Sequence, residues 1–169
     1  MAATNLSNKN LNINATNLID RLKSDYSAFT FVPGKDDQWS PHSATIYYNL
    51  NQPDISLAYG ILHELAHAQL SHNNYKTDFE LLKLEAAAWD LAVKIGANYG
   101  VVLNEDHIQN CLDTYRDWLH RRSTCPTCGT HVLQEDTSNY HCFNCQSNWK
   151  VTSGRFSRAY RRYIPASYR

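Results

Sequence analysis

The spacing of apolar residues divides most of the chain into helical and extended segments. Apolar side chains recur at helical spacing in four segments: roughly 15–26, 54–72, 78–95 and the stretch that follows Asn104. Two stretches, "SAFTFVPG" and "SATIYYNL", are rich in β-forming residues and predict strands. Asp54, Asn104 and the T-x-x-E pair of Thr77 and Glu80 are expected to cap three of the helices. The pattern therefore predicts an α+β fold that is mostly helical with a short sheet.

Composition changes abruptly at Ser123, where we place a domain boundary. Residues 1–124 contain 10 Lys and Arg against 14 Asp and Glu, whereas residues 125–169 contain 6 against 2. An acidic body and a basic end suggest two parts with different partners. We expect an Asn-rich, flexible lead-in at 1–14, a main domain at 15–123, a cysteine-rich module at 124–150 and a basic aromatic tail at 151–169.

No run of about 18 apolar residues is present, so we expect no membrane partner. The N-terminus lacks the apolar core of a signal peptide. The five cysteines fit reducing surroundings better than a disulfide framework. These features together predict a cytoplasmic protein.

The segment "GILHELAHAQLSH" contains the pattern H-E-x-x-H, formed by His63, Glu64 and His67. Positions i and i+4 share a helix face, so both histidines can point at one metal ion, and imidazole suits zinc. Zinc lowers the pKa of a bound water to about 7, and Glu64 is placed to accept its proton. The alternative is a helix that carries two histidines and a glutamate by coincidence.

Glu85 is the better of two candidates for a third protein ligand. It stands in the middle of an apolar stripe, and a buried carboxylate is costly unless it meets a cation or a metal. The alternative for Glu85 is a salt bridge at the helix edge. His72 lies about 140° from His67 on a continuing helix and can bind only if the helix has ended. We therefore expect His72 to be a surface or hydrogen-bonding histidine, with contact to a substrate as the alternative.

The C-terminal part contains Cys125, Cys128, Cys142 and Cys145, in the pattern C-x₂-C, 13 residues, C-x₂-C. This spacing is typical of a zinc ribbon, in which four thiolates close a structural site; disulfides are the alternative. A segment this short has little apolar core, so metal binding is expected to drive its folding.

The tail interleaves cations with aromatic rings, a composition that favours contact with nucleic acid. An equal alternative is a segment whose aromatic side chains pack on the protein. The candidate contacts are Arg155, Arg158, Arg161 and Arg162.

"HELAHAQLSH" followed by "LEAAAWDLA" resembles the ImmA/IrrE family of gluzincin-type metallopeptidases. The resemblance covers roughly residues 40–95 and implies a zincin-like fold, with His63, His67 and Glu85 as zinc ligands and Glu64 as the base. Members of that family are associated with cleaving repressor-type regulators. The cysteine-rich C-terminus departs from the family pattern. A ribbon after an H-E-x-x-H domain is instead similar to the SprT-like metalloproteases, which act on DNA-bound proteins but use a third histidine.

These observations predict a zinc metalloendopeptidase with one catalytic and one structural zinc ion and a protein substrate, such as a repressor-like or DNA-bound protein. The rival from another class is a zinc-ribbon regulator that binds nucleic acid and has a non-catalytic H-E-x-x-H.

Overall fold

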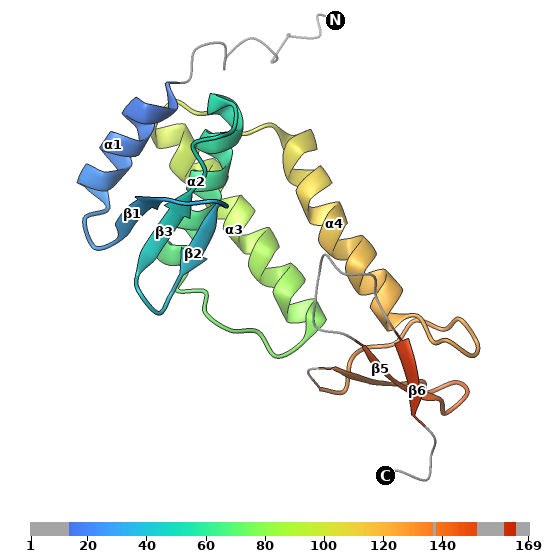
Figure 1. The fold of residues 1–169 in the computed structure, drawn as a ribbon. Coiled ribbons are helices and arrows are strands. Elements are labelled where there is room, and N and C mark those ends of the chain that lie inside the picture. The colour runs from blue at the N-terminus through green and yellow to red at the C-terminus, as the bar shows by residue number, and fades with distance from the viewer. Residues whose placement is uncertain (1–13, 137, 152–160, 165–169) are drawn as a thin grey trace, which may run out of the picture. The chain divides into compact units, whose positions relative to one another are not determined.

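The structure is a computed structural model that describes residues 14–136, 138–151 and 161–164, the last of these as backbone only (Figure 1). The predicted lead-in up to residue 13, and Arg155 and Arg158, lie outside the described residues. The helices are α1 (Ala15–Asp25), α2 (Asp54–Gln69), α3 (Asp78–Asn98) and α4 (Glu105–Ser123). The strands are β1 (Thr30–Pro33), β2 (Gln38–Ser40), β3 (Thr45–Tyr48), β4 (Asn139–His141), β5 (Asn148–Val151) and β6 (Arg161–Ile164). The expected α+β class is confirmed.

The chain divides into two compact units. The first contains residues up to 73 together with 86–108, and the second contains 74–85 and the chain from 109 onward. Two divisions fall inside helices. One follows Glu85 within α3, and the other follows Ile108 within α4, so both helices are continuous elements that contribute to both units.

The first unit is organised around β3 and α2. β3 is the central strand, parallel to β1 and antiparallel to β2, in the order β1-β3-β2. α2 packs against β3 and β2, and α1 packs against α2. α2 buries most of its length, because its apolar residues point to several sides: Leu57, Ala58, Tyr59, Ile61, Leu62, Leu65, Ala66 and Ala68. The segment that carries the H-E-x-x-H pattern is therefore the most buried helix of this unit.

Three expected helix caps have different outcomes. His107 donates its backbone N–H to the Asn104 side chain (3.0 Å), as expected for an N-cap. Glu80 donates its backbone N–H to the Thr77 hydroxyl (3.2 Å), which is half of the expected capping box. The other half differs, because the Glu80 carboxylate accepts from the Lys76 amide (2.7 Å).

The expected cap at Asp54 is wrong. Pro53 occupies the N-cap position of α2, and no side chain caps the helix there. The Asp54 carboxylate instead accepts a hydrogen bond from the Ala15 amide (3.3 Å), at the start of α1. A tertiary contact has taken the place of the local one, although a carboxylate in the first turn still suits the helix dipole.

The second unit contains the four cysteines and the sheet β4-β5-β6, in which each neighbouring pair is antiparallel. Its small core contains Cys125, Val132, Tyr140, Cys142, Trp149 and Val151. Asp78, at the start of α3, is buried together with Arg122 near the end of α4, and the two form an ion pair (2.6 Å). A buried Tyr140 hydroxyl also donates to Asp78. This polar cluster joins three segments that are distant in sequence.

Part of the expected tail is a strand. β6 pairs with β5 in the register Asn148 to Ile164 and Val151 to Arg161. Arg161 and Arg162 therefore belong to a sheet, although only their backbone is described. None of the described helices is long and apolar enough to cross a bilayer.

Candidate metal centres

The first candidate centre begins with two histidines on one face of α2. His63 is buried and His67 half-buried, and their Nε2 atoms lie 3.1 Å apart. Their rings meet edge to face, with centroids 4.6 Å apart. The i and i+4 spacing therefore places the two imidazoles as the sequence predicts.

Glu85 completes this group. Its side chain is buried, with 7% of its surface exposed. The ligand atoms of His63, His67 and Glu85 all lie within 4.8 Å of one another. The structure thus brings together the three residues expected to hold the catalytic metal. Among the described residues, this set and the four cysteines are the groups that could hold a metal ion.

The group fits zinc in geometry and in donor type. Two nitrogen ligands at 2.0–2.1 Å from a tetrahedral ion lie about 3.3 Å apart, close to the separation of the two Nε2 atoms. Two imidazoles and one carboxylate form a donor set that zinc accepts with one position left open. A calcium or magnesium site would require a shell of oxygen atoms instead.

Glu64 is oriented by a strand that the sequence pattern did not reveal. The backbone N–H of Trp39, in β2, donates to Glu64 Oε2 at 2.6 Å. The carboxylate of Glu64 is half-buried, one residue away from His63 on α2. A hydrogen bond of this length restricts the orientation of the carboxylate. Trp39 is therefore a site residue that sequence reasoning missed.

His72 lies beside His67 rather than at the surface of a continuing helix. α2 ends at Gln69, and Ser71 adopts a left-handed backbone conformation (φ 54°). The Nδ1 atoms of His67 and His72 are 2.8 Å apart. His72 is thus in contact with an expected ligand, and it is not part of the metal-type group that contains Glu85.

An aromatic stack supports the His63 ring. Trp89, one turn after Glu85 on α3, is stacked on His63 with centroids 4.1 Å apart and an interplanar angle of 23°. The His107 ring contacts Trp89 and Tyr59 edge to face, with ring centroids 5.7 Å and 5.0 Å away, respectively. Burial is the main cause that lowers the pKa of His107. The stacking of Trp89 on His63 was not predicted from the sequence.

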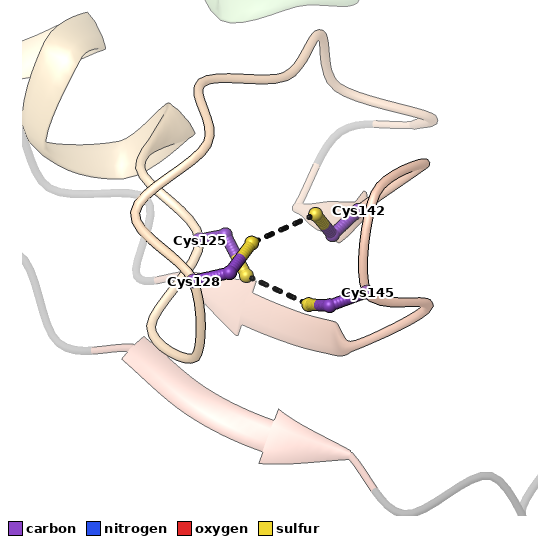
Figure 2. Close-up of side chains that lie close together, drawn as sticks. All are labelled: Cys125, Cys128, Cys142 and Cys145. Atoms are coloured by element: carbon purple, nitrogen blue, oxygen red, sulfur yellow. Dashed lines mark hydrogen bonds between the residues drawn. The ribbon is translucent and has the colours of Figure 1, made fainter.

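The second candidate centre is the set of four cysteines (Figure 2). Each C-x₂-C pair lies in a turn, and the four sulfur atoms point toward one another. Cys125 Sγ lies 3.5 Å from Cys145 Sγ, and Cys128 Sγ lies 3.5 Å from Cys142 Sγ. Sulfur ligands of one tetrahedral zinc ion lie about 3.8 Å apart, given a Zn–S distance of about 2.3 Å. No disulfide joins any of the five cysteines, all of which lie in the described part of the chain, so this arrangement fits a four-thiolate metal site better than disulfides.

The four thiols have different environments. Hydrogen bonding with the side chain and backbone of Thr130 lowers the pKa of Cys128 to about 5. Hydrogen bonding with Ser147 lowers the pKa of Cys145. Burial raises the pKa of Cys142 to about 11. Four thiolates this close together would repel one another, and a bound cation would offset that repulsion.

A comparison of the chain with protein-family models, with curated proteins and with solved structures finds no match.

Proposed function

We propose that this protein is a zinc-dependent endopeptidase that cleaves a protein substrate. The observation that carries the proposal is the convergence of His63, His67 and Glu85 within 4.8 Å, beside a glutamate whose carboxylate is held by a backbone amide. Two histidines and a glutamate form a catalytic type of zinc site, because the fourth position stays open for water or substrate.

Each residue has a separate role in this proposal. His63, His67 and Glu85 hold the metal, and Trp89 keeps the His63 ring in place by stacking. When bound, the zinc ion polarises the scissile carbonyl and supplies a nucleophile at neutral pH. Glu64 takes the proton of the attacking water and returns it to the leaving amine. The Trp39 amide, which donates to Glu64 Oε2, holds the carboxylate in position to accept that proton.

The four cysteines have a structural role in the proposal. Four thiolates saturate a tetrahedral zinc ion and leave no position for chemistry. The residues around them form a small core with two large buried aromatic side chains, Tyr140 and Trp149. We therefore assign a zinc ribbon to this part of the second unit, with the metal as part of its folding energy.

The class of substrate is proposed from resemblance. The segments around His63 and Glu85 resemble ImmA/IrrE metallopeptidases, which favours a repressor-like protein as substrate. The additional ribbon is similar to the arrangement in SprT-like proteases, which favours a protein bound to DNA. Both suggestions share a cytoplasmic protein substrate associated with nucleic acid.

The alternative is a regulator that binds nucleic acid and has a non-catalytic H-E-x-x-H. It is favoured by one observation, the excess of six basic over two acidic residues after residue 124. It predicts that Glu64 is dispensable, whereas the peptidase requires it.

Replacing Glu64 by Gln tests the peptidase directly. The amide keeps the size of the side chain but cannot accept the proton, so the cleavage rate should fall by roughly 10²–10⁴-fold. The assay is a search of a cell lysate for new protein N-termini that appear with the zinc-loaded wild-type protein. The matched control is Glu80→Gln, since the carboxylate of this glutamate accepts from the Lys76 amide just before α3 and is not part of the metal-type group. Equal cleavage by wild type and Glu64→Gln would reject the proposal.

A further inference from the structure

His67 uses its two ring nitrogens in two directions. Its Nε2 lies 3.1 Å from His63 Nε2, within the group that could hold a metal. Its Nδ1 lies 2.8 Å from His72 Nδ1. The rings of His67 and His72 meet edge to face, with centroids 4.9 Å apart and an angle of 69° between their planes. Such an approach aims a ring nitrogen of one residue at a nitrogen of the other.

A histidine that binds a metal through Nε2 is neutral and carries its single ring proton on Nδ1. That N–H needs an acceptor, because the acceptor fixes both the tautomer and the orientation of the ring. His72 Nδ1 is at hydrogen-bonding distance and can accept if its own proton is on Nε2. The pair therefore has one consistent arrangement when Nε2 of His67 faces the metal.

A turn and two backbone hydrogen bonds hold His72 in a position where its ring can accept the His67 proton. The left-handed residue Ser71 turns the chain back, and the His72 amide donates to the His67 carbonyl (3.0 Å). The indole Nε1 of Trp39 donates to the His72 carbonyl (2.9 Å). The backbone amide of the same tryptophan donates to Glu64 Oε2. Trp39 thus connects the segment of His72 with the carboxylate of Glu64.

We propose that His72 is a positioning residue that accepts the Nδ1 proton of His67, and that Trp39 holds His72 in register with Glu64. This inference rests on the proposed metal site. It assigns His72 a role through His67, which specifies the hydrogen-bonding alternative expected from the sequence instead of the substrate contact. Hydrogen-bond partners of metal-ligating histidines typically contribute about 10–100-fold to metal affinity.

The test is a titration of the full chain with Co²⁺ that is monitored by ultraviolet and visible absorption. Thiolate-to-metal bands report the four-cysteine site, and the weaker visible bands of nitrogen and oxygen ligation report the His63 site. The cysteine site is an internal control in every variant. His72→Phe keeps an aromatic ring without an acceptor, whereas His72→Gln supplies a side-chain oxygen that can accept the proton. His42→Phe is the matched control, because His42 is exposed in the turn before β3.

The proposal predicts that His72→Phe weakens Co²⁺ at the His63 site by about 10–100-fold and leaves the cysteine site unchanged. His72→Gln should recover most of the affinity, and His42→Phe should equal wild type. If His72→Phe does not fold, as judged by circular dichroism, His72→Ala makes the same comparison.

Three results would overturn the inference. They are an affinity of His72→Phe within twofold of wild type, an equal loss in the Phe and Gln variants, and a loss as complete as that of Glu85→Ala. The last would make His72 a ligand. Failure of the proposed metal site gives a different result, because wild type would then bind Co²⁺ only at the cysteines, and failure of the peptidase function is read separately from Glu64→Gln.

Discussion

Replacing Asp78 by Ala should destabilise the second unit strongly. The Asp78 side chain is 3% exposed and that of Arg122 is 1% exposed. Arg122 donates to Asp78 through Nε (2.6 Å) and Nη2 (3.2 Å), so the pair is bidentate. The Tyr140 hydroxyl donates to the same carboxylate. The change would leave a buried guanidinium without this carboxylate and a buried hydroxyl without its acceptor.

The magnitude follows from that burial. Removing one partner of a buried ion pair costs about 3–5 kcal/mol, because the desolvated charge is no longer compensated. The stacking of the Arg122 guanidinium on Trp118 (4.4 Å) remains and offsets only a part of this cost. The exposed pair Arg116 and Asp113, with 46% and 60% of their side chains accessible, provides the control. Asp113→Ala should cost at most about 1 kcal/mol.

Urea unfolding at saturating zinc, followed by tryptophan fluorescence, measures both variants. The buried Trp118 and Trp149 report on this unit. The expected result is a lower midpoint for Asp78→Ala with an unchanged slope. A free energy of unfolding for Asp78→Ala within about 1 kcal/mol of that for Asp113→Ala would refute the reasoning.

Three further changes test other parts of the account. Gly96→Ala would place a Cβ 2.7 Å from Leu103 Cδ1 and 2.8 Å from the Val101 carbonyl, so thermal unfolding should show a loss of about 1–3 kcal/mol despite the better helix propensity of alanine; no loss would contradict the packing. Cys125→Ser should release the structural zinc and unfold the residues around Trp149, as seen by metal analysis and near-ultraviolet circular dichroism; retained zinc would exclude Cys125 as a ligand. If the tail binds nucleic acid, changing Arg155, Arg158, Arg161 and Arg162 to Gln should weaken DNA or RNA binding and flatten its salt dependence in a polarisation assay; unchanged binding would return the tail to a packing role.

The nucleic-acid test replaces four arginines instead of deleting the tail, because the structure shows that a deletion would also remove part of the core. Removing the chain from residue 146 would delete β5 and the fully buried Trp149. Loss of binding would then report an unfolded module instead of lost phosphate contacts.

The helices were predictable because their signals are local. Apolar spacing located all four, and the Thr77 and Asn104 caps marked two of their starts correctly. The burial of Glu85 was also predictable from helical spacing alone, since a residue flanked by buried residues on the same helix face is itself buried. The cysteine group was predictable from its C-x₂-C spacing.

The missed features depend on tertiary contacts. β2 has three residues and one large apolar side chain, which is too short for an alternating pattern. Its Trp39 amide nevertheless orients Glu64. The left-handed conformation of Ser71, which returns His72 to His67, has no signal in a serine. These tertiary contacts orient the side chains of the site, whereas the sequence motifs identify which residues form it.

Zinc content of the purified chain is a direct measure of the proposed site formed by His63, His67 and Glu85. We expect two zinc ions per chain in the wild-type protein and in Glu64→Gln, because Glu64 is not one of the proposed ligands. Glu85→Ala should retain one ion, held by the four cysteines, while Glu80→Ala retains two. Two tightly held ions in Glu85→Ala, or a single ion in the wild-type protein, would contradict a catalytic zinc site formed by His63, His67 and Glu85.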